Sequence, residues 1–110
     1  MKSGIAKPNT PPLLPRRARE SSKRDYGRLL ILAGSTGYTG APNFASRSAV
    51  RSGAGLVWLG VPERIYGICA LKNDEAMPFP LPCDGRGCLT AEALPEVEAR
   101  LERMDCLAIG

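Results

Sequence analysis

The residues best suited to chemistry form a glycine-rich run that directly follows an aliphatic segment. Glycines alternate here with hydroxyl-bearing residues, in the order Gly34-Ser35-Thr36-Gly37-Tyr38-Thr39-Gly40-Ala41. Because glycine has no Cβ, the main-chain N–H groups of such a loop can approach an anion closely. A strand that breaks into a loop of this kind before a helix is where α/β proteins bind phosphorylated ligands. The run therefore predicts a ligand-binding loop.

The spacing of the glycines separates this loop from two common phosphate-binding loops. Gly34, Gly37 and Gly40 give G-x-x-G-x-x-G, which is neither G-x-G-x-x-G nor G-x-x-x-x-G-K-[ST]. The alternative is structural, because glycines in a tight connection between a strand and a helix also satisfy turn geometry without binding anything. The composition of the loop alone leaves both interpretations open.

Composition limits other kinds of chemistry. The chain has no histidine, which excludes a Ser-His-Asp or Cys-His arrangement and a histidine-ligated metal within its 110 residues. The hydroxyl groups of the loop are therefore interpreted as ligand-binding groups, and no catalytic residue is predicted. Cys83 and Cys88 have the spacing of a zinc-binding pair, but Cys69 and Cys106 fall on a predicted helix and a predicted strand. We expect reduced thiols and no metal site.

Hydrophobic patterning predicts the elements that position the loop. Right-handed crossover makes the first two strands parallel neighbours, with the loop at the carboxyl end of the first. Phe44, Ala45, Ala49 and Val50 are expected to form the apolar face of the helix that follows the loop. The predicted elements are a central strand over 28–33, a helix over 41–52, a strand over 56–61, a short helix over 63–71 and a proline-rich edge strand or extended segment over 76–81.

The last part of the chain predicts an amphipathic helix and the start of another strand. Thr90 is expected to cap this helix, and Glu96 and Arg100 to form an i,i+4 ion pair on its solvated face. An apolar strand then follows over 105–110. Because a parallel sheet of about three strands has an uncovered edge, we expect a truncated domain. The predicted apolar stripe of the helix is Leu94, Val97, Leu101 and Met104.

Residues 1–25 form a basic, proline-rich arm in which the net charge of +4 is concentrated. Its prolines predict an extended chain that enters the fold near Tyr26 and Gly27. The arm is either a solvated leader or a contact for RNA or an acidic membrane surface. Aromatic residues make up only 5% of the chain, and no apolar run approaches about 20 residues. We therefore expect a cytoplasmic protein with neither a nucleic-acid nor a membrane partner.

Several segments together resemble the opening of a known enzyme family. They read SKRDYGRLLILAGS over 22–35, GYTGAP over 37–42, RSGAGLV over 51–57 and VPE over 61–63. In this order, within 14–110, they resemble the ADP/ATP-dependent NAD(P)H-hydrate dehydratases. The resemblance implies a ribokinase-like, three-layer α/β fold with a mostly parallel sheet. Residues 26–110 would form only the amino-terminal part of that domain.

The resemblance also implies an activity and a set of site residues. Family members are hydro-lyases that use ADP or ATP, with Mg²⁺, to remove water from hydrated NADH or NADPH (NADHX or NADPHX), by phosphorylating the hydrate and eliminating phosphate. The implied partner is thus a small nucleotide substrate, and the full-length enzyme is expected to be a homo-oligomer. Carried over by position, Ala41 beside Gly40 contacts the hydrated nicotinamide nucleotide, and Gly34, Ser35 and Tyr38 belong to the same substrate loop.

The chain departs from the family pattern at two places. The family's His-Lys-Gly before the first strand is Ser22-Lys23-Arg24 here. Gly110 matches the first glycine of the family's Gly-Pro-Gly-Leu-Gly loop, and the later adenine-nucleotide segment and catalytic Gly-Thr-Gly-Asp loop do not occur in these residues. We therefore expect a fragment that is inactive alone. Two other interpretations stay open: another ribokinase-like small-molecule kinase, and a noncatalytic nucleotide-binding module.

Overall fold

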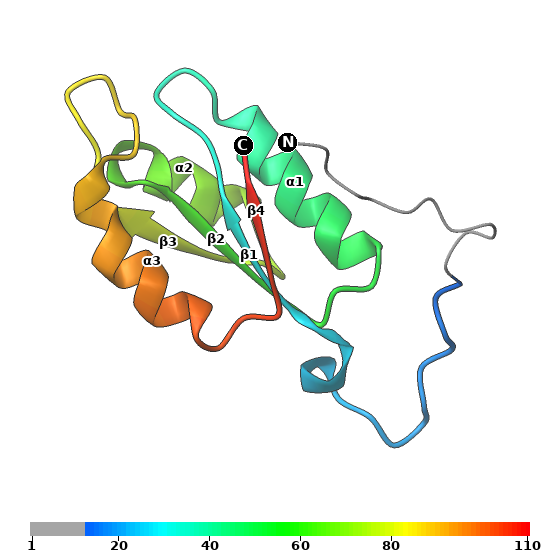
Figure 1. Cartoon of the computed structure of the whole chain (residues 1–110). Coiled ribbons are helices and arrows are strands. Elements are labelled where there is room, and N and C mark those ends of the chain that lie inside the picture. The colour runs from blue at the N-terminus through cyan, green and yellow to red at the C-terminus, as the bar shows by residue number, and fades with distance from the viewer. Residues whose placement is uncertain (1–12) are drawn as a thin grey trace, which may run out of the picture.

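The centre of the fold is a four-stranded sheet in which every pairing is parallel. The computed structural model describes residues 13–110 and contains the strands β1 (Arg28–Leu32), β2 (Leu56–Pro62), β3 (Met77–Leu81) and β4 (Cys106–Ile109). Their order is β3-β2-β1-β4, so β1 has a neighbour on each side (Figure 1). β3 carries two prolines and lies at an edge, where a strand need not donate hydrogen bonds on its outer side. The predicted strands and the edge position of the proline-rich segment are confirmed.

Helices cover both faces of the sheet and make three layers (Figure 1). α1 and α2 pack on one face, and α3 packs on the other. No helix within residues 13–110 is long and apolar enough to cross a membrane. The helices of this part of the chain are α1 (Gly40–Arg51), α2 (Glu63–Lys72), α3 (Leu94–Leu101) and the short 3-10 helices η1 (Lys23–Tyr26) and η2 (Ala91–Ala93).

Two apolar clusters hold the layers together, because side chains alternate between the faces of each strand. On one face, Ile31 of β1 packs in a cluster with Ile65 of α2. On the opposite face, Leu30 of β1 packs in a cluster with Val97 of α3. Both faces of β1 are thus buried, which explains its near-continuous aliphatic sequence.

The inner face of α1 is more polar than the sequence pattern predicts. Phe44 is 72% exposed and Ala45 is also exposed, so their assignment to the apolar face is wrong. Asn43 and Ser46 are buried instead, because they have hydrogen-bond partners there. The residues of α1 that are buried or partly buried are Pro42, Asn43, Ser46, Ala49 and Val50.

The helical segment after Thr90 also differs from its prediction. Thr90 precedes a 3-10 helix, and its hydroxyl forms no cap and has no hydrogen-bond partner. The tighter winding of the 3-10 turn changes which residues face the sheet, so Leu94 is 54% exposed. The predicted Glu96–Arg100 ion pair is confirmed, with 2.9 Å between Oε1 and Nη2. The residues that pack against the sheet are Ala93, Val97, Leu101 and Met104.

The described part of the basic arm is not simply extended. Lys23–Tyr26 forms a 3-10 helix that begins with a capping box at Ser22, so the prediction of an extended chain is wrong here. Arg17 donates a hydrogen bond to the carbonyl oxygen of Gly53 at 2.9 Å, and its guanidinium carbon lies 4.3 Å from the centroid of the Tyr26 ring. The arm therefore contacts the connection between α1 and β2. The part of the predicted arm before residue 13 lies outside the described residues.

The start of β4 is tied to β1 by Arg28, the first residue of β1, and Asp105, the residue just before β4. The Asp105 N–H donates to the Arg28 carbonyl oxygen at 2.8 Å, and the Arg28 N–H donates to Asp105 Oδ2 at 2.8 Å. The Arg28 Nε lies 3.2 Å from the same carboxylate oxygen. These bonds orient a strand whose own side chains are all exposed.

We predict that Asp105→Asn makes stability less sensitive to acid. Hydrogen bonds from the Arg28 side chain and then from its backbone hold the pKa of Asp105 below its usual range. A carboxyl whose folded pKa is depressed contributes stability above its unfolded pKa, and loses it as the pH falls through the folded pKa. The midpoint of urea unfolding should therefore fall less steeply with acidification in the variant. Glu98→Gln, on the exposed side of α3, is the control, and equal slopes for Asp105→Asn and the parent chain would contradict the prediction.

We predict that Gly60→Ala overpacks the face of the sheet covered by α3. A methyl group at Gly60 would lie 2.6 Å from Leu32 Cδ2 and 2.9 Å from both Leu81 Cδ1 and Phe79 Cζ. Overpacking of this kind costs about 1–3 kcal/mol, measurable by denaturant unfolding. Gly67→Ala on α2 meets no atom within 4 Å and should instead stabilise by roughly 0.5–1 kcal/mol. Equal effects of the two substitutions would refute this explanation.

Candidate functional site

Three segments of the chain lie at the edge formed by the carboxyl ends of the parallel strands. The glycine-rich loop follows β1, the segment 82–90 follows β3, and Gly110 follows β4. In Figure 1 the first two are the cyan and yellow loops at the same end of the molecule. The Gly110 N–H donates to the Leu32 carbonyl oxygen at 3.1 Å, which holds the end of β4 beside the start of the glycine-rich loop. Ligands of open α/β sheets bind at this edge.

The middle of the glycine-rich loop is a tight turn. The Tyr38 N–H donates to the Ser35 carbonyl oxygen at 2.9 Å, and Gly37 has a φ of +85°. A positive φ at the third residue is what a type II turn requires, and glycine adopts it without strain. The Tyr38 side chain is 73% exposed, whereas Ser35 is half-buried. The turn therefore presents Tyr38 to solvent at the carboxyl edge.

Gly34 has a packing role as well as a place in the loop. Its φ is +91°, and a methyl group there would lie 2.8 Å from Ile65 Cδ1 and 3.0 Å from Pro42 Cγ. A side chain would force the loop away from both α1 and α2. The structural interpretation of this glycine is therefore supported, whether or not the loop also binds a ligand.

The first turn of α1 is open toward the carboxyl edge. The Thr39 side chain forms no N-cap hydrogen bond. As at any helix start, the N–H groups of Gly40 and Ala41 have no intrahelical acceptor, and Pro42 has no N–H. Ala41 is exposed and Gly40 is half-buried, so little side-chain bulk covers these donors. The positive end of the helix dipole and these N–H groups together favour an anion or a polarised carbonyl group.

A buried polar network, which the sequence did not reveal, holds this helix start in place. Asn73, which follows α2, donates to Asn43 Oδ1 at 2.5 Å and accepts from Ser46 Oγ at 2.6 Å. Asn43 in turn donates to the Thr39 carbonyl oxygen at 2.6 Å. The network therefore runs from the end of α2 to the end of the glycine-rich loop. The sequence pattern nevertheless indicated that Asn43 and Ser46 would face the core, because they share a helical face with Val50.

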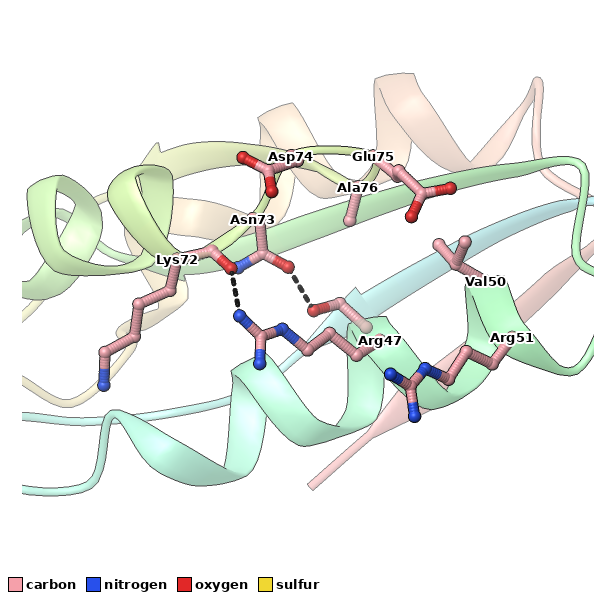
Figure 2. Close-up of a pocket in the computed structure, with 9 residues that line it drawn as sticks. Arg47, Val50, Arg51, Lys72, Asn73, Asp74, Glu75 and Ala76 are labelled. Carbon is pink, nitrogen blue, oxygen red and sulfur yellow. Dashed lines mark hydrogen bonds between the residues drawn. The ribbon is translucent and has the colours of Figure 1, made fainter.

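A separate pocket of about 170 Å³ lies between the second half of α1 and the connection from α2 to β3 (Figure 2). Arg47 and Arg51 lie on its α1 side, and Asp74 and Glu75 lie on the opposite side. Arg47 donates to the Lys72 carbonyl oxygen at 3.0 Å. None of the predicted site residues lines this pocket. It is distinct from the carboxyl edge and does not extend the candidate site.

The cysteines do not form a metal centre. All four are free, and Cys69 is buried in the core. Burial raises the pKa of the Cys69 thiol, and the charge of Lys72 opposes this only in part. Within residues 13–110 no three His, Cys, Asp or Glu side chains are grouped so that they could hold a metal ion. The site is therefore built from backbone, hydroxyl and small residues.

The sequence matches a family model described as NAD(P)H-hydrate dehydratase over residues 29–110. The chain belongs to the NAD(P)H-hydrate dehydratase family. The matched range includes β1, the glycine-rich loop, α1 and every later element of the fold. The predicted family is confirmed.

Named relatives agree with this family. The chain is 44% identical over 97 residues to a bifunctional NAD(P)H-hydrate repair enzyme of Moorella thermoacetica, covering 88% of this chain but 18% of that protein. It is 45% identical over 65 residues to an ADP-dependent (S)-NAD(P)H-hydrate dehydratase of Streptococcus pneumoniae, covering 59% of this chain and 22% of that protein. The chain thus spans about a fifth of the length of these relatives.

A solved structure confirms the predicted fold class. The chain resembles a ribokinase-like superfamily protein of Enterococcus faecalis with a TM-score of 0.57 and 23% sequence identity, over 82% of this chain and 37% of that one. The three-layer arrangement of the described residues is therefore a ribokinase-like α/β architecture. The dehydratase-family loop residues Gly34, Ser35, Tyr38, Gly40 and Ala41 lie together at its carboxyl edge, and their contact with a ligand stays a prediction.

We predict that Asn73→Ala destabilises the chain by about 1–3 kcal/mol. The substitution leaves the buried side-chain oxygen of Asn43 without its donor and removes one of the two acceptors of the Ser46 hydroxyl, and an unpaired buried group carries a desolvation cost. Urea unfolding measures the loss. Asp74→Ala, at the adjacent exposed residue, should change the free energy of unfolding by less than about 0.5 kcal/mol. If both variants unfold at the same midpoint, the network does not stabilise the fold.

Proposed function

We propose that the chain supplies the substrate loop of an ADP- or ATP-dependent NAD(P)H-hydrate dehydratase, which restores NADH or NADPH from NADHX or NADPHX. The observation that carries the proposal is the open start of α1 behind the glycine-rich loop, within the range matched by the family. The Streptococcus pneumoniae relative is named ADP-dependent, which supports a nucleotide-dependent reaction. The match also favours this activity over that of another ribokinase-like small-molecule kinase.

In this proposal the chain's own residues bind and orient the hydrated nicotinamide nucleotide. The N–H groups of Gly40 and Ala41 donate to an oxygen of the ligand, at the positive end of α1. Gly34, Ser35 and Tyr38 form the adjoining wall, with the Tyr38 side chain exposed at the edge. ADP or ATP, when bound, would supply the phosphoryl group that converts the hydroxyl of the hydrate into a phosphate leaving group.

The segment Gly34–Ala41 does not by itself fit a Mg²⁺ site, because Mg²⁺ in nucleotide enzymes is usually bound through one or two carboxylates together with the phosphates. The segment Gly34–Ala41 contains no carboxylate, and within residues 13–110 no three His, Cys, Asp or Glu side chains are grouped so that they could hold a metal ion. We therefore assign neither Mg²⁺ nor a catalytic residue to this chain, and derive no step through the metal. A cytoplasmic location, expected from the composition of the sequence, and a homo-oligomeric full-length enzyme, expected from the family resemblance, are also part of the proposal.

Binding of NADHX to the ¹⁵N-labelled chain tests the proposal. Amide resonances of the segment Gly34–Ala41 should shift on addition of NADHX, with smaller shifts on addition of ATP alone. If ATP but not NADHX moves them, the chain is a nucleotide-binding module of another kind. If neither ligand does, the loop is only structural.

We predict that Ala41→Glu abolishes NADHX binding while the fold is kept. The side chain fills the approach to the loop and repels phosphate, whereas a negative charge in the first turn favours the helix itself. Ala45→Glu, one turn later and also exposed, is the control and should bind NADHX like the parent chain. Titrations followed by amide shifts compare the affinities. Unchanged affinity in Ala41→Glu would remove Ala41 from the site.

A further inference from the structure

The glycine-rich loop is held from outside by the turn that follows β3. Gly87 is buried, with a φ of +75°, and a methyl group on it would collide with the Thr36 hydroxyl oxygen. The same methyl group would lie 2.8 Å from Thr36 Cβ and 3.1 Å from the Thr36 backbone nitrogen. Gly87 therefore lets the backbone of one loop pack directly on the other, at the position just before Gly37.

Asp84 closes the turn that places Gly87 there. Its Oδ1 accepts hydrogen bonds from the Arg86 N–H at 2.8 Å and the Cys88 N–H at 3.0 Å. Its backbone donates to the Cys88 carbonyl oxygen at 2.9 Å, and its carbonyl accepts from the Gly87 N–H at 3.0 Å. The bond from Cys88, followed by those from Arg86 and Gly87, holds the pKa of Asp84 below its usual range. A single residue thus organises the whole turn.

We infer that the turn 84–88 is the second wall of the substrate site, and that Asp84 and Gly87 are positioning residues for the glycine-rich loop. This inference rests on the proposed function. Thr36 and Gly37 are the central residues of the turn Ser35–Tyr38, so a displaced Thr36 displaces the ligand-facing part of the loop. No side chain at Thr36, Gly37 or Tyr38 is buried, so side-chain burial does not hold this part of the loop in place. The contact between Gly87 and Thr36 restrains it instead.

Two pairs of matched variants isolate this role. Gly87→Ala introduces the collision with Thr36, whereas Gly85→Ala changes the same turn at a position with no atom within 4 Å and no positive φ. Asp84→Ala removes the acceptor of two N–H groups, whereas Asp84→Asn keeps a carbonyl oxygen that can accept them. All four substitutions lie in this turn, so the rest of the fold should be unchanged. Thermal unfolding of each variant checks that it is.

The test combines local spectra with NADHX titration of the ¹⁵N-labelled chain. In Gly87→Ala and Asp84→Ala the amide resonances of Thr36, Gly37 and Tyr38 should shift, and the dissociation constant for NADHX should rise about tenfold, the equivalent of about 1.4 kcal/mol. Gly85→Ala and Asp84→Asn should keep the parent spectra of this turn and stay within about twofold in affinity. A merely structural role of the turn 84–88 would lower the unfolding temperature without this change in affinity.

Two outcomes overturn the inference. In the first, Gly87→Ala and Asp84→Ala leave the Thr36–Tyr38 resonances where they are in the parent chain. In the second, those resonances move but the affinity for NADHX stays within about twofold. Failure of the proposed function gives a different result, because the parent chain itself then binds no NADHX. In that case the resonances of Thr36, Gly37 and Tyr38 in the variants still test whether Asp84 and Gly87 position the loop.

Discussion

β1 forms hydrogen bonds with a parallel neighbour on each side, β2 along one edge and β4 along the other. Because all four strands run in the same direction, their carboxyl ends meet at one edge, and the loops that follow them lie together there. The loop after β1 and the turn after β3 contact each other because both strands run parallel to β2, which lies between them. The register of β1 therefore decides which loop residues can form one site.

Patterns that depend on local sequence were predicted well, and contacts between distant segments were not. The aliphatic run of β1, the prolines of β3 and the helix after the glycine-rich loop follow from periodicity and turn chemistry. Burial of Asn43 and Ser46 depends on Asn73, which lies 30 and 27 residues away, and a polar residue on a helix normally predicts exposure. The misplacement of Leu94 has a local cause, a 3-10 turn that changes the helical phase.

The same division applies to the candidate site. Sequence alone placed the glycine-rich loop between a buried strand and a helix, and family resemblance selected its residues. Neither could show that Gly34 packs against Pro42 and Ile65, or that Gly87 packs on Thr36, because these contacts exist only once the helices and loops are assembled. Glycine spacing thus left a structural role and a ligand-binding role open, and the packing of Gly34 shows the structural one.

The segment Gly34–Ala41 contains no charged side chain, so in the proposed function its attraction for an anionic nucleotide rests on backbone N–H groups and the dipole of α1. An interaction with a helix dipole is worth only about 0.3–1 kcal/mol at an exposed site. Such weak interactions contribute to affinity only if the N–H donors already point toward the ligand before it binds. The free-energy cost of ordering the loop on binding would otherwise offset them. The proposed function thus gives a physical reason for the three points at which the segment is restrained: at Gly34 by α1 and α2, at Thr36 by Gly87, and at Thr39 by Asn43. In a loop without charge, the rigidity of its support takes the place of electrostatic strength.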